Sequence, residues 1–151
     1  MNKLFIYYSL TGNGDAVASI LSSEGIKTIR IETATPLPKS KFPMLLVGGF
    51  KALINYKDKL VDFDNNIKDY DEILIGSPIW FDRLCSPINA LLDMLELGNK
   101  KITFILYSGS GKASKAVKKI TKMYSKNRII LLKEPKNNIE GNKELLLKEL
   151  R

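Results

Sequence analysis

The sequence predicts an α/β protein: a doubly wound parallel sheet of five strands with helices on both faces. Short, wholly apolar segments such as "EILIG" and "ITFILY" alternate with segments whose apolar residues recur at helical spacing. Strands without a polar face need cover on both sides, which is typical of parallel sheets. The chain of 151 residues can bury one good core and is too short for two ordinary domains. We therefore expect a single domain, residues 1–151.

The expected strands are rich in branched and aromatic residues and end in turn-forming residues. In chain order they are Lys3–Tyr8, Ile26–Glu32, Glu72–Gly76, Lys101–Tyr107 and Arg128–Lys133.

The expected helices place apolar residues on one face and end near glycine or polar residues. They span residues 13–23, 87–95, 112–126 and 143–151. A further helix is predicted over residues 44–54, although Gly48 and Gly49 each disfavour it by about 1 kcal/mol relative to alanine. The preceding "TPLPKSKFP" contains three prolines and is predicted to be a loop.

Composition excludes several kinds of chemistry. The chain has no histidine, so Ser-His-Asp and Cys-His catalysis and histidine zinc sites are excluded. Cys85 is the only cysteine, which rules out an intrachain disulfide; we expect it to be a buried small hydrophobe. No apolar run is long enough to span a bilayer, and the N-terminus enters a strand without a secretory signal. We expect a cytoplasmic protein.

The first predicted strand ends in a glycine-rich turn, within "YYSLTGNGDAVA". Its backbone N–H groups would lie at the positive end of a helix dipole, and glycine lets an anion approach closely. The turn has no lysine, unlike the P-loop of nucleotide triphosphatases, and its spacing does not fit the dinucleotide fingerprint. The sequence therefore predicts a phosphate cradle of neutral donors; the alternative is an ordinary capped turn.

Two later loops follow the third and fourth predicted strands, in "GSPIWFDRLCSPINALLD" and "YSGSGK". In doubly wound sheets, ligands bind beyond the carboxyl ends of the strands. Trp80 and Phe81 follow a proline turn there, so at least one ring is expected to be partly exposed and able to stack on a ligand. The alternative is that both rings belong to the core.

Together these three stretches resemble the flavodoxin family, in the correct order and over essentially the full chain. The resemblance implies strand order 2-1-3-4-5 and FMN at the switch point, for which flavodoxin is the usual example. It implies that the first loop holds the flavin phosphate, that Ser77 reaches the phosphate or ribityl chain, that the next four residues line the isoalloxazine, and that the third loop holds its pyrimidine edge. The implied cofactor-binding residues are Ser9, Leu10, Thr11, Gly12, Asn13, Gly14, Ser77, Pro78, Ile79, Trp80, Phe81, Ser108, Gly109, Ser110 and Gly111.

Two positions depart from the family pattern. Gly14 stands where the family usually has threonine, which removes one hydroxyl donor to the phosphate. Asp82 stands where the related pattern has glycine, in a loop whose peptide turns over in flavodoxins to hydrogen-bond flavin N5. A positive φ is unfavourable for a non-glycine residue, although Asp tolerates it better than most.

The net charge of +8 lies entirely in the last third of the chain, since residues 1–100 balance to −1 and residues 101–151 to +9. Flavodoxins are typically acidic, so this is another departure. Five lysines of the helix predicted over residues 112–126 are spaced three and four apart and form one stripe: Lys112, Lys115, Lys119, Lys122 and Lys126. A lysine stripe is usually just a solvated helix face.

Three functions are compatible with these features. The leading hypothesis is an FMN-binding electron carrier whose redox partner proteins dock on the lysine stripe. The second is a flavin or quinone reductase that uses NAD(P)H. The third is a flavin-free binding module whose basic face meets nucleic acid or another polyanion, although no aromatic residue interleaves the lysines.

Overall fold

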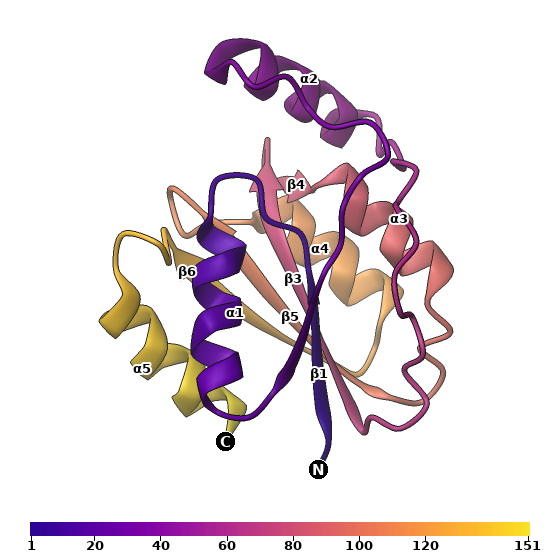
Figure 1. Cartoon of the computed structure of the whole chain (residues 1–151), viewed down its shortest axis with the longest axis vertical. Helices are drawn as coiled ribbons and strands as arrows, with labels where there is room; N and C mark the ends of the chain where they lie inside the picture. The colour runs from indigo at the N-terminus through magenta and orange to yellow at the C-terminus, as the bar shows by residue number, and fades with distance from the viewer.

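The computed structural model describes residues 1–151 and centres on a parallel sheet (Figure 1). Its strands are β1 (Lys3–Tyr7), β2 (Lys27–Arg30), β3 (Glu72–Trp80), β5 (Lys101–Ser108) and β6 (Asn127–Lys133). They run in the order β2-β1-β3-β5-β6, and every neighbouring pair is parallel. This confirms the predicted fold class, with the order 2-1-3-4-5 when only these five strands are counted.

Helices cover both faces of the sheet. On one face, α1 (Asn13–Ser23) and α5 (Ile139–Leu150) pack on side chains such as Phe5, Leu74 and Ile105. On the other, α3 (Ser86–Met94) and α4 (Ser114–Met123) pack on neighbouring strand residues such as Ile6 and Ile75. Successive strand side chains point to opposite faces, so wholly apolar strands supply both cores.

The third predicted strand was too short. It was expected to stop at Gly76, but β3 continues to Trp80 and turns back through the two-residue strand β4 (Arg83–Leu84), which pairs with it antiparallel. Pro78 did not end the strand, because the extension pairs with β5 on one side as far as Tyr107. The result is a short hairpin that projects beyond the parallel sheet.

Helix α2 (Lys41–Leu53) begins inside the segment that was predicted to be a proline loop. Pro43 is its third residue, and the first turn of a helix tolerates proline because its N–H has no intrahelical acceptor. Figure 1 shows α2 above the carboxyl end of the sheet, near β4, instead of on a sheet face. The only buried residues of α2 are Gly48, Gly49 and Ala52.

Two later boundaries also differ from the prediction. Helix α4 spans ten residues, shorter than the predicted 112–126, and α5 begins at Ile139, four residues before the predicted Lys143. Asn138 caps α5 by accepting a hydrogen bond from the Gly141 amide, and this cap explains the early start. None of the helices combines the length and the apolar character needed to cross a membrane.

Candidate cofactor site at the carboxyl end of the sheet

Three connections meet where the central parallel strands end: β1 to α1, the β3–β4 hairpin, and β5 to α4 (Figure 1). Because β1 and β3 are neighbours and β3 and β5 are neighbours, these connections lie next to one another. The fold thus brings together the three segments in which all predicted cofactor-binding residues lie.

The first connection, residues 10–14, presents unpaired backbone donors. The amides of these residues donate to no protein acceptor, whereas the next amide, that of Asp15, donates to Ser9 Oγ at 3.3 Å. Unpaired N–H groups at a helix N-terminus form an anion site. This donor set fits a phosphate group.

Two glycines give this connection its shape. Gly12 has a φ of 96°, a left-handed conformation that side chains disfavour. A Cβ at Gly14 would lie 2.5 Å from the Tyr107 hydroxyl and 2.8 Å from the Tyr8 carbonyl oxygen. The threonine that the family usually has at position 14 therefore does not fit here, because the Tyr107 hydroxyl occupies that space and donates a hydrogen bond to the Tyr8 carbonyl.

The Ser9 side chain forms hydrogen bonds with Asp15 of α1 and does not face the open side of the connection. Its hydroxyl donates to Asp15 Oδ2 at 2.7 Å and its side chain is buried. Asp15 also accepts hydrogen bonds from Tyr7 and Arg30, the latter at 2.9 Å in an ion pair. Burial and the Asp15 charge raise the pKa of Tyr7 to about 12. The hydroxyl is thus engaged within the protein, and the predicted phosphate contact of Ser9 would have to use its backbone amide.

A lysine lies beside the first connection, although the sequence predicted only neutral donors there. The backbone amide of Lys136, between β6 and α5, donates to Asn13 Oδ1 at 3.0 Å, and its Nζ donates to the Thr11 carbonyl at 3.4 Å. Its side chain crosses Gly12, where an added Cβ would lie 3.3 Å from Lys136 Cδ. No local motif could have revealed this residue, because it is more than 120 positions away in the chain.

Ser77, predicted to contact the phosphate or ribityl chain, lies in β3 beneath the site surface. The residue is fully buried, and its hydroxyl lies 2.9 Å from the Pro78 carbonyl and 3.5 Å from Cys85 Sγ. Cys85 is itself fully buried, as predicted, and burial raises its pKa to about 12. A thiol held neutral in this way is not a redox nucleophile.

The aromatic pair at the hairpin tip divides between core and surface. Trp80 is partly buried and meets Tyr8 edge to face, with ring centroids 6.1 Å apart. Phe81 is 57% exposed, which confirms that at least one ring is accessible. Gly48 and Gly49 of α2 face these rings, so closely that a Cβ at Gly49 would overlap the Phe81 ring. The glycine pair that weakened the helix prediction thus lets α2 pack on the tip.

The tip itself is a left-handed turn, with φ of 47° at Phe81 and 63° at Asp82. Two such residues match the twist of a two-residue hairpin, a position where Asn-Gly is preferred. Asp82 is held there by α4: its Oδ2 accepts the Lys115 amide at 3.1 Å and its carbonyl accepts the Ala116 amide at 2.9 Å. Asp82 thus caps α4, although it lies in the hairpin and not next to the helix in sequence. This contact explains why an aspartate stands where the family pattern has glycine.

In the third connection, hydroxyls order the backbone. Ser110 Oγ accepts the Lys112 amide at 3.2 Å, and Ser108 Oγ donates to the Lys112 carbonyl at 3.2 Å. Gly111 has a left-handed φ of 70° and packs on Lys133, while Gly109 is exposed. An open hollow of about 410 Å³ lies between this connection and the hairpin, and it is lined by Ile79, Asp82, Ser108, Gly109, Ser110, Lys112 and Ser114.

A second, smaller hollow of about 120 Å³ lies between α2 and the hairpin. Its lining is mostly apolar: Leu10, Met44, Leu45, Gly48, Gly49, Ile79, Trp80 and Phe81. Ile79 lines both hollows, so they adjoin. The smaller hollow is below the roughly 300 Å³ of a typical ligand pocket. A flat aromatic ring would use the open hollow, or would need Phe81 and α2 to shift.

The predicted lysine stripe is only partly a free surface. Lys119 Nζ donates to Asn89 Oδ1 at 2.9 Å and to Asn55 Oδ1 at 3.2 Å, and burial lowers its pKa. Lys115 and Lys122 line, with Arg83, a basic hollow of about 330 Å³ beside Lys119. Lys112 and Lys126 lie outside α4, so helical spacing does not place them on its face, and the prediction of five lysines on one helix stripe was wrong for these two.

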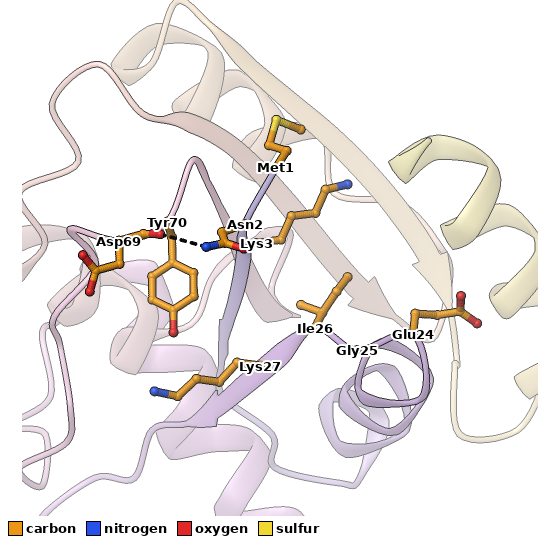
Figure 2. A pocket seen from close by; sticks show the side chains of 9 residues that line it. All are labelled: Met1, Asn2, Lys3, Glu24, Gly25, Ile26, Lys27, Asp69 and Tyr70. Atoms are coloured by element: carbon orange, nitrogen blue, oxygen red, sulfur yellow. Dashed lines mark hydrogen bonds between the residues drawn. The ribbon is translucent and has the colours of Figure 1, made fainter.

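Another open hollow, of about 540 Å³, lies at the opposite end of the sheet, beside the amino ends of β1 and β2. Figure 2 shows its side chains spread around an open surface, with one hydrogen bond among them, from Asn2 to the Asp69 carbonyl. Lys3, Glu24 and Lys27 do not converge on one point. Its lining contains one aromatic residue, Tyr70, and no helix N-terminus, so it is not the better candidate.

The sheet and the three connections define a doubly wound α/β protein with a candidate ligand site at its switch point. Residues 54–146, more than half of the chain, match a family model described as Flavodoxin, so the chain belongs to the flavodoxin family. This match includes the second and third connections but not residues 10–14. No individually curated protein matches the chain.

Solved structures share the fold along nearly the whole chain. A flavoprotein from Lactobacillus acidophilus in complex with FMN is 20% identical, with 92% of this chain and 97% of that one covered and a TM-score of 0.67. A candidate flavoprotein from Bacteroides uniformis is 19% identical, with 97% of both chains covered and a TM-score of 0.74. An oxidised flavodoxin from Bacillus cereus is 14% identical, with 99% and 97% covered and a TM-score of 0.52.

Proposed function

We propose that this protein binds one FMN at the carboxyl end of its sheet and carries electrons between redox partner proteins. The observation that carries the proposal is the row of unpaired amides at residues 10–14, beside two hollows lined by the other connections. Family membership supports the same cofactor. The bound flavin would supply the redox chemistry, since the chain has no histidine and its one thiol is buried and neutral.

The residues divide the work of binding. The amides of Thr11, Gly12 and Asn13 would receive the phosphate, and Ile79, Trp80 and Phe81 would contact the ring. Ser108–Gly111, which are partly or fully exposed, would contact its polar edge mainly through backbone groups. Ser9, Gly14 and Ser77 would hold these segments in place without contacting the flavin through side chains. Ser9 and Ser77 are buried, and Gly14 packs so closely on the Tyr107 hydroxyl that a Cβ would not fit.

The proposed docking surface is the lysine stripe without Lys119. Lys115 and Lys122 adjoin Arg83 of the hairpin, so positive charge lies close to the proposed ring site. Such a surface favours partners with acidic faces and raises association rates at low salt.

Flavin titration tests the cofactor. The protein, freed of flavin, is titrated with FMN, FAD and riboflavin while flavin fluorescence is followed. We expect one equivalent of FMN to bind in preference to the other two. Equal affinity for FMN and riboflavin would show that the amides do not hold phosphate, and the absence of any flavin binding would favour the flavin-free module.

Alanine variants test the ring contact. Trp80→Ala and Phe81→Ala are each expected to weaken FMN binding by about three- to tenfold, because stacking contributes about 0.5–1.5 kcal/mol beyond area burial. Tyr56→Ala removes an exposed aromatic ring outside both hollows and serves as the control. If neither hairpin variant changes affinity or quenching, the ring lies elsewhere.

Nucleotide oxidation separates a carrier from a reductase. The FMN-loaded protein alone, mixed with NADH or NADPH, is expected to leave the nucleotide unoxidised, whereas a chemical reductant reduces the flavin. Rapid NAD(P)H oxidation would instead identify a flavin or quinone reductase.

A further inference from the structure

The Lys136 side chain lies beside the unpaired amides of residues 10–14. Its Nζ donates to the Thr11 carbonyl at 3.4 Å, and its methylene groups cross Gly12. Any side chain at position 12 would meet those methylene groups, so the glycine that opens the connection also makes room for Lys136. The ammonium group thus lies at the rim of the proposed phosphate site.

The position of Lys136 is fixed by its backbone. The Asn137 amide closes a turn by donating to the Glu134 carbonyl at 2.8 Å, and buried Pro135 occupies a turn position where proline is favoured. The Glu134 amide donates to the Ser108 carbonyl at 3.1 Å, which ties the turn to the third connection. The Lys136 amide then binds the Asn13 side chain at 3.0 Å. The turn is therefore joined to two of the three connections of the site.

The ammonium group also has no carboxylate partner. Arg30, the other cation at this connection, forms ion pairs with Asp15 at 2.9 Å and Glu32 at 2.7 Å, so its charge is largely balanced. Lys136 has no carboxylate within 4.0 Å, and its only protein acceptor is a neutral carbonyl. Its charge is available to an anion bound on the neighbouring amides.

We propose that Lys136 is a phosphate-binding residue of this flavoprotein, with its ammonium group paired to the terminal phosphate of FMN. This inference rests on the proposed function and refines it: the cradle is cationic, not neutral. Riboflavin lacks the phosphate, so Lys136 favours FMN over riboflavin and leaves the ring contacts unchanged. A charge-assisted hydrogen bond to phosphate is the strong kind, and it weakens as salt screens the ammonium.

The test compares Lys136→Gln with Lys136→Arg and with Lys148→Gln. Lys148 is an exposed residue in the last turn of α5, so its change to glutamine alters net charge equally but away from the site. Dissociation constants for FMN and riboflavin are measured at low and high ionic strength. We expect Lys136→Gln to weaken FMN binding about five- to fiftyfold at low salt, the scale of a lost charge-assisted hydrogen bond, with riboflavin unchanged within about twofold.

The remaining variants complete the comparison. Lys136→Arg is expected to retain most of the FMN affinity, and Lys148→Gln all of it. The salt dependence of FMN binding should become shallower in Lys136→Gln only. If Lys136→Gln keeps the wild-type preference for FMN over riboflavin, the inference is wrong while the proposed function stands. If the wild-type protein itself shows no such preference, the proposed phosphate site fails first.

Discussion

The two ends of the candidate site are built differently. Around residues 9–14, the backbone is fixed before any ligand is bound. The glycines there are closely packed, and the polar side chains form hydrogen bonds within the protein. Around Phe81, an exposed ring in a left-handed turn contacts a helix that buries only three small residues. The first region is preorganised for one chemical group, and the second can adapt. We therefore expect phosphate recognition to be sensitive to small changes and ring recognition to tolerate them.

The largest expected effect is that of Gly14→Ala. Its Cβ would lie within 3 Å of Tyr107, Tyr8 and Ser9, and overpacking of this kind costs about 1–3 kcal/mol of unfolding free energy. FMN affinity should fall with it. Urea unfolding measures the loss, and adding Tyr107→Phe, which removes the nearest atom, should restore part of the stability. A fully stable Gly14→Ala protein with normal FMN binding would contradict the idea of a preorganised end.

Tyrosine hydroxyls form hydrogen bonds at the preorganised end, so the unfolding free energy should depend on pH. Burial and the Asp15 charge raise the Tyr7 pKa to about 12, burial raises that of Tyr8 to about 12, and burial raises that of Tyr107 well above 10. Unfolded tyrosine ionises near pH 10. Between these values the folded state holds more protons, so the unfolding free energy should fall as pH rises from about 10 to 12.

Urea midpoints measured from about pH 8 upward check this slope. Cys85 adds to the fall because its pKa is also raised, whereas Lys119 opposes it because its pKa is lowered. Tyr7→Phe should therefore make the decline shallower than in the wild type, and Tyr56→Phe, an exposed control, should leave it as it is. An unchanged slope in Tyr7→Phe would mean that the phosphate end does not depend on this hydroxyl.

Asp82→Ala tests the turn at the adaptable end. The variant removes the acceptor for the Lys115 amide and leaves a residue with a φ of 63°, which alanine tolerates less well than Asp. We expect a loss of about 1–2 kcal/mol, typical of a lost helix cap. Asp82→Asn keeps an acceptor and should lose less. If both variants lose the same unfolding free energy, the stabilisation comes from the charge of Asp82 and not from its hydrogen bond to the Lys115 amide.

The smallest expected effect is that of Gly49→Ala, the same substitution as at position 14 but at the other end. The three atoms nearest to the added Cβ all belong to the Phe81 ring, which is mostly exposed and can rotate away. Alanine gains up to about 1 kcal/mol of helix propensity, so stability should change by less than about 0.5 kcal/mol. Any change in flavin affinity should be equal for FMN and riboflavin. A loss as large as that of Gly14→Ala would remove the difference between the two ends.

The sequence predicted what depends on local pattern and missed what depends on distant partners. Apolar periodicity was enough for the five strands and their two covered faces, and the turn residues that follow the strands indicated the three connections. It could not show that Asp82 caps α4, that Lys119 is held by Asn55 and Asn89, or that Lys136 reaches Thr11, because each contact joins separate elements. Pro43 was assigned to a loop, but it lies in the first turn of α2. The glycine pair was expected to weaken the helix predicted over residues 44–54, but it faces aromatic rings and lets the helix pack on them.

Helix α2 has a consequence for local unfolding. Its large side chains are exposed, Phe42 at 72% and Phe50 at 62%, and little apolar area holds it to the protein. Its firm attachment is at the C-terminal end, where Lys51 pairs with Asp58 at 2.5 Å and Asp58 accepts a hydrogen bond from buried Ser86. The helix should therefore open from Lys41 toward Lys51, well below the free energy of global unfolding. In amide exchange it would be the first helix to lose protection, and each opening would uncover Trp80.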